Sequence, residues 1–182
     1  MANICCSTVE IHGDVKELGE AIIQSLTTPD GTTDEWIGNF LLHLGMTEKE
    51  IHDSPIGCRA DVTFFEIDND HITLDIDSAW SPQFTPLMML CEKYAPEASV
   101  FYRAVESGAE LYLTNDPDYE NSFYCESWGN EELYGFYDRD GLKAEMETIL
   151  KKQAGFVNLI EEITDTCDVA INKMEYCEID EL

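Results

Sequence analysis

The sequence is short of basic residues. Ten lysines and arginines stand against 38 aspartates and glutamates, which gives a formal net charge of −28 at pH 7. Affinity for nucleic acid depends mainly on lysines and arginines that displace counterions from phosphates. A strongly negative protein repels a phosphate backbone but attracts basic proteins and cations. The sequence therefore predicts no direct binding of DNA or RNA and favours a basic protein partner.

Several motifs are also missing. The seven cysteines form no Cys-x-x-Cys pair, and the four histidines have no His-x-x-x-His spacing. We therefore expect reduced, mostly buried thiols rather than a disulfide framework or a zinc ribbon. A Cys–His nucleophile pair that forms only in space stays open. Because no apolar run reaches the ~20 residues of a membrane span and no signal peptide precedes the first strand, we expect a cytoplasmic protein without membrane contact.

The N-terminal part predicts a strand followed by helices. The run 4–12 is rich in β-forming residues and predicts the strand. Asp14 and Glu17 have the spacing of a capping box at the start of a helix. Four apolar residues at helical spacing give this helix a buried stripe: Val15, Leu18, Ile22 and Leu26. A second helix is expected from residue 34 or 35.

Residues 61–78 predict a β-hairpin, because two alternating runs flank a short polar turn. In the simplest register Asp75 faces Phe64 and Asp77 faces Val62, so no two acids lie directly opposite each other. One side of the hairpin is then apolar. The other side carries five polar residues: Glu66, Asp68, His71, Asp75 and Asp77.

Asp68, Asp75 and Asp77 on that polar side are the best candidate metal ligands in the sequence. Carboxylate oxygens are the ligands that Mg²⁺ and Ca²⁺ prefer. However, a polar sheet face in so acidic a protein carries acids even without a ligand. We expect no cofactor, with Mg²⁺ or Ca²⁺ at these three residues as the alternative.

After Trp80 the chain turns into a helix. Ser81-Pro82 and Thr85-Pro86 each place an N-cap residue before a proline. We expect Trp80 to pack under this helix, and the other aromatic residues to pack in the core rather than to stack on bases. The rest of the chain predicts four strands, two of them joined through Gly129-Asn130, and then two helices: 99–105, 109–114, 122–128, 132–137, 141–153 and 156–175.

This order of elements matches an α+β fold of the ferredoxin-like βαββαβ type. An antiparallel sheet would carry helices on one face, with a helical insertion after the first helix and extra strands and helices at the C-terminus. Residues 1–115 would form the core, with the insertion at about 27–60. Residues 116–182 would form a C-terminal strand and helix extension that packs on the same domain.

Three stretches carry a family likeness: MANICCSTVEIHG, IGCRADVTFFEI from Ile56, and DSAWSPQFTPLMML from Asp77. They resemble the YubB-like, ferredoxin-like-domain proteins of plasmids and phages. The residues that match the family pattern are Gly57, Asp61, Ala79, Trp80, Ser81 and Pro82, whereas Ile56 and Ala60 replace two tryptophans of that pattern. The resemblance covers about the first 115 residues. It implies the fold, structural roles for these residues and a mobile-element setting, but no catalytic residues.

The resulting hypothesis is a non-catalytic interaction protein of a mobile element. Its acidic surface would imitate the charge of DNA and bind a basic host factor that handles nucleic acid. The alternatives are a divalent-metal-binding protein or enzyme that uses the acidic hairpin face, and a sheet module that binds a small molecule or nucleic acid.

Overall fold

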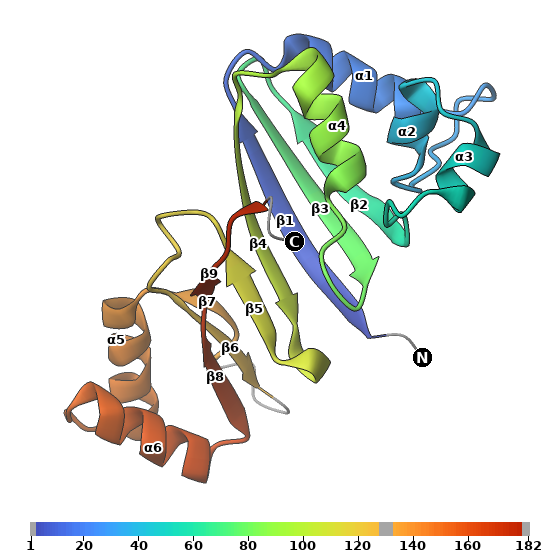
Figure 1. Cartoon of the computed structure of the whole chain (residues 1–182). Coiled ribbons are helices and arrows are strands. Elements are labelled where there is room, and N and C mark those ends of the chain that lie inside the picture. Colours follow the sequence, from blue (N-terminus) through green and yellow to red (C-terminus); the bar gives the residue numbers. More distant parts are fainter. Residues whose placement is uncertain (1–2, 128–132, 180–182) are drawn as a thin grey trace. The chain divides into compact units, whose positions relative to one another are not determined.

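The computed structural model describes residues 3–127 and 133–179 (Figure 1). The chain divides into two compact units, Met1–Leu111 with Cys177–Leu182, and Tyr112–Tyr176. Both units combine helices with antiparallel strands, so the fold class is α+β. Trp128 and the predicted Gly129-Asn130 junction lie outside the described residues.

The first unit is built on four antiparallel strands in the order β2-β3-β1-β4. Its elements in chain order are β1 (Ile4–His12), α1 (Lys16–Leu26), α2 (Asn39–His43), α3 (Glu48–Asp53), β2 (Ala60–Ile67), β3 (His71–Ala79), α4 (Thr85–Tyr94), β4 (Ser99–Glu106) and the short turn η1 (Ser107–Ala109). Helices α1 and α4 lie on one face of this sheet (Figure 1).

Alternation along the strands explains this layering. The residues that face the helices are fully buried, among them Val9, Ile11, Ile72, Leu74 and Ile76. The predicted stripe is confirmed, because Leu18, Ile22 and Leu26 of α1 are fully buried, as is Val15 directly before the helix. At Gly19 the helix approaches so closely that an added Cβ would lie 2.6 Å from Cγ2 of Ile67.

The predicted capping box of Asp14 and Glu17 is wrong. Helix α1 begins at Lys16, and Val15 occupies the N-cap position without any side-chain cap. Since Val15 is fully buried, apolar burial rather than carboxylate capping determines where this helix begins.

The helix predicted from residue 34 or 35 also begins later, at the first residue of α2. The segment before it lies along the edge of β2 instead. The carbonyl oxygen of Glu35 accepts a hydrogen bond from the amide of Val62 at 2.7 Å, and the amide of Ile37 donates to the carbonyl oxygen of Ala60 at 3.0 Å. Backbone pairing with a sheet edge satisfies these groups, which a helix would otherwise have to pair internally.

The hairpin of β2 and β3 is confirmed, but its register contains a β-bulge. The register shifts between Val62 and Phe64, so that Val62 faces Ile76 and Asp61 faces Asp77. The prediction that no two acids face each other is therefore wrong at this pair. The bulge turns Val62 inward, where only 2% of its surface is exposed, and the burial of this side chain favours the shifted register.

The turn after β3 differs from its prediction at two points. Helix α4 begins at Thr85 with Pro86 in its first turn, whereas Ser81-Pro82 begins no helix. Trp80 does not pack under the helix, because half of its surface (50%) is exposed and its φ of 73° lies in the left-handed region. Phe84 takes the core position, 2% exposed and edge-on to Tyr102 at a centroid distance of 5.2 Å.

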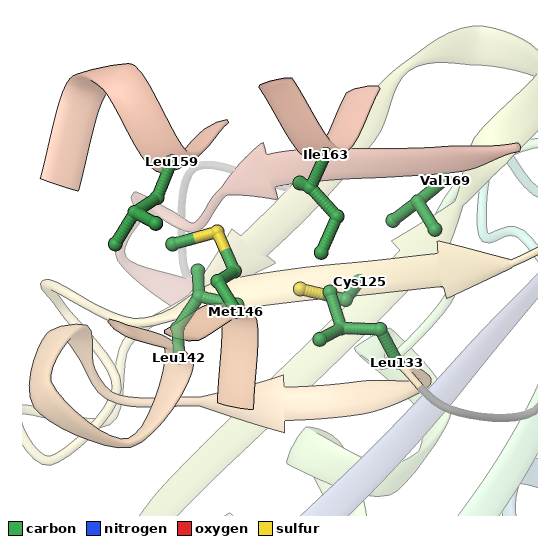
Figure 2. Close-up of a cluster of buried hydrophobic side chains, with 7 residues drawn as sticks. All are labelled: Cys125, Leu133, Leu142, Met146, Leu159, Ile163 and Val169. Carbon is green, nitrogen blue, oxygen red and sulfur yellow. The ribbon is translucent and has the colours of Figure 1, made fainter. Parts of the chain in front are cut away.

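The second unit has its own small sheet and core. Its elements are β5 (Leu111–Thr114), which begins at the last residue of the first unit, β6 (Phe123–Ser127), β7 (Gly135–Tyr137), α5 (Arg139–Leu150), α6 (Phe156–Thr166), β8 (Val169–Lys173) and β9 (Glu175–Tyr176). Strands β7, β6 and β8 form an antiparallel sheet with β6 in the centre, and β5 pairs with β9 in parallel. Figure 2 shows the buried side chains of this core: Cys125, Leu133, Leu142, Met146, Leu159, Ile163 and Val169.

The single helix predicted over 156–175 is wrong beyond Thr166. After α6 the chain forms β8, which pairs with β6 from Val169 opposite Ser127 to Lys173 opposite Phe123. The sequence VAINK contains two β-branched residues, which are favourable in a strand. Pairing with β6 therefore overrides the helical spacing of the last apolar residues.

The buried face of β3 should dominate the stability of the first unit. Ile76 is fully buried and faces Ser7 in β1 and Val62 in β2. We expect Ile76→Ala to lower the free energy of unfolding by about 2–5 kcal/mol, since it removes buried methyl groups and leaves a cavity. Urea unfolding followed by tryptophan fluorescence measures this loss. The control Glu66→Ala, at an exposed position of β2, should stay within about 0.5 kcal/mol of the wild type, and equal losses in both variants would contradict the assignment.

Candidate functional site

Titratable and hydrogen-bonding side chains of the first sheet gather on the face opposite α1 and α4. We call it the outer face. Strand alternation and the observed cross-strand pairs assign to it Cys6, Thr8, Glu10 and His12 of β1, Asp61, Phe64 and Glu66 of β2, His71, Thr73, Asp75 and Asp77 of β3, and Phe101 and Arg103 of β4. Towards the start of β3 this face is rich in histidine, and towards its end it is rich in acids.

Three potential metal ligands converge at the histidine end. His12 and His71 are a direct cross-strand pair of β1 and β3, and their rings stack with centroids 4.5 Å apart and planes inclined by 13°. Oε2 of Glu10 lies 3.6 Å from Nε2 of His12. One ligand atom from each of the three residues lies within 4.8 Å of the other two. We call Glu10, His12 and His71 the histidine cluster.

Neighbouring side chains hold this cluster in place. Arg103 donates from Nη2 to Oε1 of Glu10 at 3.0 Å, which leaves Oε2 directed at His12. The hydroxyl of Thr73 lies 3.3 Å from Nε2 of His71. The ring of Phe101 lies against His12 with a centroid distance of 5.8 Å. Glu10 and His71 are partly buried by these contacts.

The acids predicted as metal ligands lie apart from one another. Asp75 accepts a hydrogen bond from Oγ1 of Thr8 at 2.8 Å, and Asp77 faces Asp61. Asp68 precedes β3, and its amide donates to the carbonyl oxygen of His71. Among the described residues, the potential ligands that come within 4.8 Å of one another in a set of three are those of the histidine cluster. Asp68, Asp75 and Asp77 are not brought together as one set.

The residues of the family pattern lie at the joint between β2 and α4. Gln83 connects the two sides, because its Oε1 accepts from the amide of Arg59 at 2.6 Å and its Nε2 donates to the carbonyl oxygen of Ala79 at 3.3 Å. An added Cβ at Gly57 would lie 3.1 Å from the same Oε1. Ser81 accepts from Oγ of Ser78 through its carbonyl oxygen. Asp61 and Ala79 line a cavity of about 290 Å³ beside this joint, Pro82 lines a second one, and Trp80 is exposed.

Cysteine nucleophiles are disfavoured at most positions. Burial raises the pKa of the thiols of Cys5 and Cys58, and it raises the pKa of Cys91 and of Cys125 to about 12. Because the thiolate is the nucleophilic form, these four residues are protonated near neutral pH and act as small apolar side chains.

Protein-family models, curated protein sequences and solved structures were compared with this chain, and none of them matches it. The resemblance to YubB-like proteins therefore stays a prediction that depends on the quoted residues. No helix in the described part of the chain is both long and apolar enough to cross a membrane.

The facing acids Asp61 and Asp77 should cost stability, because like charges directly opposite each other in a sheet repel. We expect Asp61→Asn to raise the free energy of unfolding by about 0.2–1 kcal/mol at low salt. The gain should shrink as added salt screens the pair. Urea unfolding at two salt concentrations measures both effects, and a variant less stable than the wild type at low salt would contradict the expected repulsion.

The thiol of Cys6 should react slowly below strongly alkaline pH. Partial loss of solvent, together with the charge of Asp77 and a hydrogen bond to it, raises the pKa of this thiol to about 11. All these causes disfavour the thiolate, so the rate of alkylation by iodoacetamide should rise with pH and reach half of its maximum, its midpoint, near pH 11. Asp77→Asn should move that midpoint to lower pH. Mass spectrometry of the Cys6 peptide over a pH series gives the midpoint, and an unchanged midpoint in the variant would remove Asp77 as a cause.

Proposed function

We propose that this protein is a non-catalytic interaction protein whose acidic outer face binds a basic surface of another protein. The observation that carries this proposal is the facing pair Asp61 and Asp77, with Asp75 and Glu66 on the same two strands. Arg103 is the basic residue that the cross-strand pairs place on this face, and it bonds Glu10 at the other end. Arg59 lines a cavity together with Asp61 and Asp77, so the acidic end sets one basic side chain against Asp61, Asp75 and Asp77 and keeps a net negative charge.

The whole chain strengthens this local field. With 38 acids and ten basic residues, a net charge of −28 remains even if every lysine and arginine forms an ion pair. Such a field accelerates association with a positively charged partner, and the effect falls as ionic strength rises. A basic side chain of the partner placed between Asp61 and Asp77 would also relieve their repulsion. The repulsion lowers the stability of the free protein, and its relief would add to the free energy of binding.

The proposal extends to fold and setting. The strand order β2-β3-β1-β4, with α1 and α4 in the two crossovers, supports a ferredoxin-like first unit. The residues Ala79 to Pro82 support kinship with the YubB-like proteins of mobile elements. In that setting the natural class of partner is a basic, nucleic-acid-handling factor of the host cytoplasm, whose DNA-binding cleft the acids would occupy in place of phosphates.

Competition with DNA tests this function. The protein is added to bacterial restriction and CRISPR nucleases that hold fluorescent duplex DNA, and DNA release and cleavage are measured at about 50 and 200 mM salt. We expect release of DNA and inhibition of cleavage for at least one nuclease, more strongly at the lower salt concentration. If neither DNA binding nor cleavage changes for any of them, the proposal fails for this class of partner.

Charge-matched variants locate the interaction. Asp61→Asn/Asp75→Asn/Asp77→Asn removes three charges from the outer face, and Glu145→Gln/Glu161→Gln/Asp165→Asn removes three from exposed positions of α5 and α6. We expect the first variant to lose inhibition by tenfold or more and the second to change it by less than threefold. Equal losses would show that net charge alone acts and would contradict a site on the outer face.

A further inference from the structure

We propose that the histidine cluster binds a divalent transition metal ion of the zinc, cobalt and nickel class. The ligands would be one imidazole nitrogen each from His12 and His71 and one carboxylate oxygen from Glu10. This site differs from the Mg²⁺ or Ca²⁺ site considered at Asp68, Asp75 and Asp77, both in position and in ligand chemistry.

The ligand set determines the class of metal. Imidazole nitrogen suits zinc, copper, nickel and iron, whereas Mg²⁺ and Ca²⁺ take oxygen ligands almost exclusively. Two histidines with one glutamate form a familiar set of three protein ligands for zinc, with the remaining position left to water or another molecule. His12 is exposed, so an ion bound to it stays accessible from solution.

The distances within the cluster are close to those that such an ion needs. Zinc–ligand bonds of about 2.0–2.1 Å place tetrahedral ligand atoms roughly 3.3 Å apart. Oε2 of Glu10 and Nε2 of His12 are 3.6 Å apart, and the full set lies within 4.8 Å. All three residues stand on the paired strands β1 and β3, whose backbone hydrogen bonds fix their Cα positions. The two imidazole planes are nearly parallel and a nitrogen lone pair lies in the plane of its ring, so one of the stacked rings must rotate about its Cβ–Cγ bond before both can bind the same ion.

The surrounding side chains fit the role of an outer shell. Hydrogen bonds from neighbouring groups commonly orient metal ligands and fix the histidine tautomer. Arg103 orients the carboxylate of Glu10, and the hydroxyl of Thr73 contacts Nε2 of His71. If that contact persists, His71 offers Nδ1 to the ion. The acidic end of the same face raises the local concentration of cations.

Metal binding is tested on the full-length, reduced protein after treatment with chelator. Calorimetry with Zn²⁺, Ni²⁺, Mg²⁺ and Ca²⁺ gives stoichiometry and affinity, and the visible absorption of added Co²⁺ gives the ligand type. We expect one Zn²⁺, Ni²⁺ or Co²⁺ per chain, weaker binding as the solution is acidified, and a cobalt spectrum without the intense charge-transfer band of cysteine ligands. Glu10→Gln, His12→Gln and His71→Gln should each weaken binding by tenfold or more.

Matched controls separate the cluster from other side chains. His52 lies outside it and its side chain is 89% exposed, so His52→Gln should change affinity by less than twofold. Circular dichroism of each variant verifies the fold, and Glu10→Gln preserves the shape of the side chain. The proposal is overturned if the wild type binds none of the three transition metals, if the three cluster variants bind as the wild type does, if cobalt shows thiolate ligation, or if tight binding is confined to Mg²⁺ or Ca²⁺.

Discussion

The antiparallel pairing of β1 with β3 is the interaction on which the first unit depends. β1 lies between β3 and β4, and its register runs from Ile4 opposite Ala79 to His12 opposite His71. This register places the buried residues of both strands against α1 and α4. A slip by one residue would turn the buried side chains of β1, among them Val9 and Ile11, to the outer face. Core packing and the position of the histidines are thus consequences of the same alignment.

Local periodicity predicted the strands and helices whose structure is determined by their own residues. The alternation in β1 and the spacing of Val15, Leu18, Ile22 and Leu26 were sufficient, because each of these segments buries one face. The same kind of pattern failed where a distant backbone was available for pairing. Residues before α2 pair with the edge of β2, and the residues after α6 pair with β6. The bulge between Val62 and Phe64 could not be predicted either, because Val62, Phe64, Phe65 and Ile67 are all apolar and the sequence does not say where the alternation is interrupted.

In the candidate site too, residues of one strand could be predicted together, whereas residues of different strands could not. Asp75 and Asp77 were predicted on one face because they lie two residues apart in a single strand. The histidine cluster combines Glu10 and His12 with a residue of a different strand, so its recognition needed the β1–β3 register, which spacing alone does not contain. One indication was present in the sequence: His12 ends the first strand and His71 begins the third, and antiparallel neighbours bring such ends together. Arg103 and Phe101 require the β1–β4 register as well.

The outer face combines two kinds of attraction that should be separable. The net charge of −28 attracts basic proteins and metal ions alike, because an electric field acts on any positive charge whatever chemical group carries it. Selection between them must come from the groups that make contact. At the end of β3 the field comes from carboxylates, which accept the hydrogen bonds of lysine and arginine. At the start of β3, Glu10 is already hydrogen-bonded to Arg103. The two imidazoles there supply nitrogen lone pairs, which bind a transition metal better than they bind a basic side chain. The two ends of one sheet face therefore differ in ligand chemistry although they share one electrostatic field.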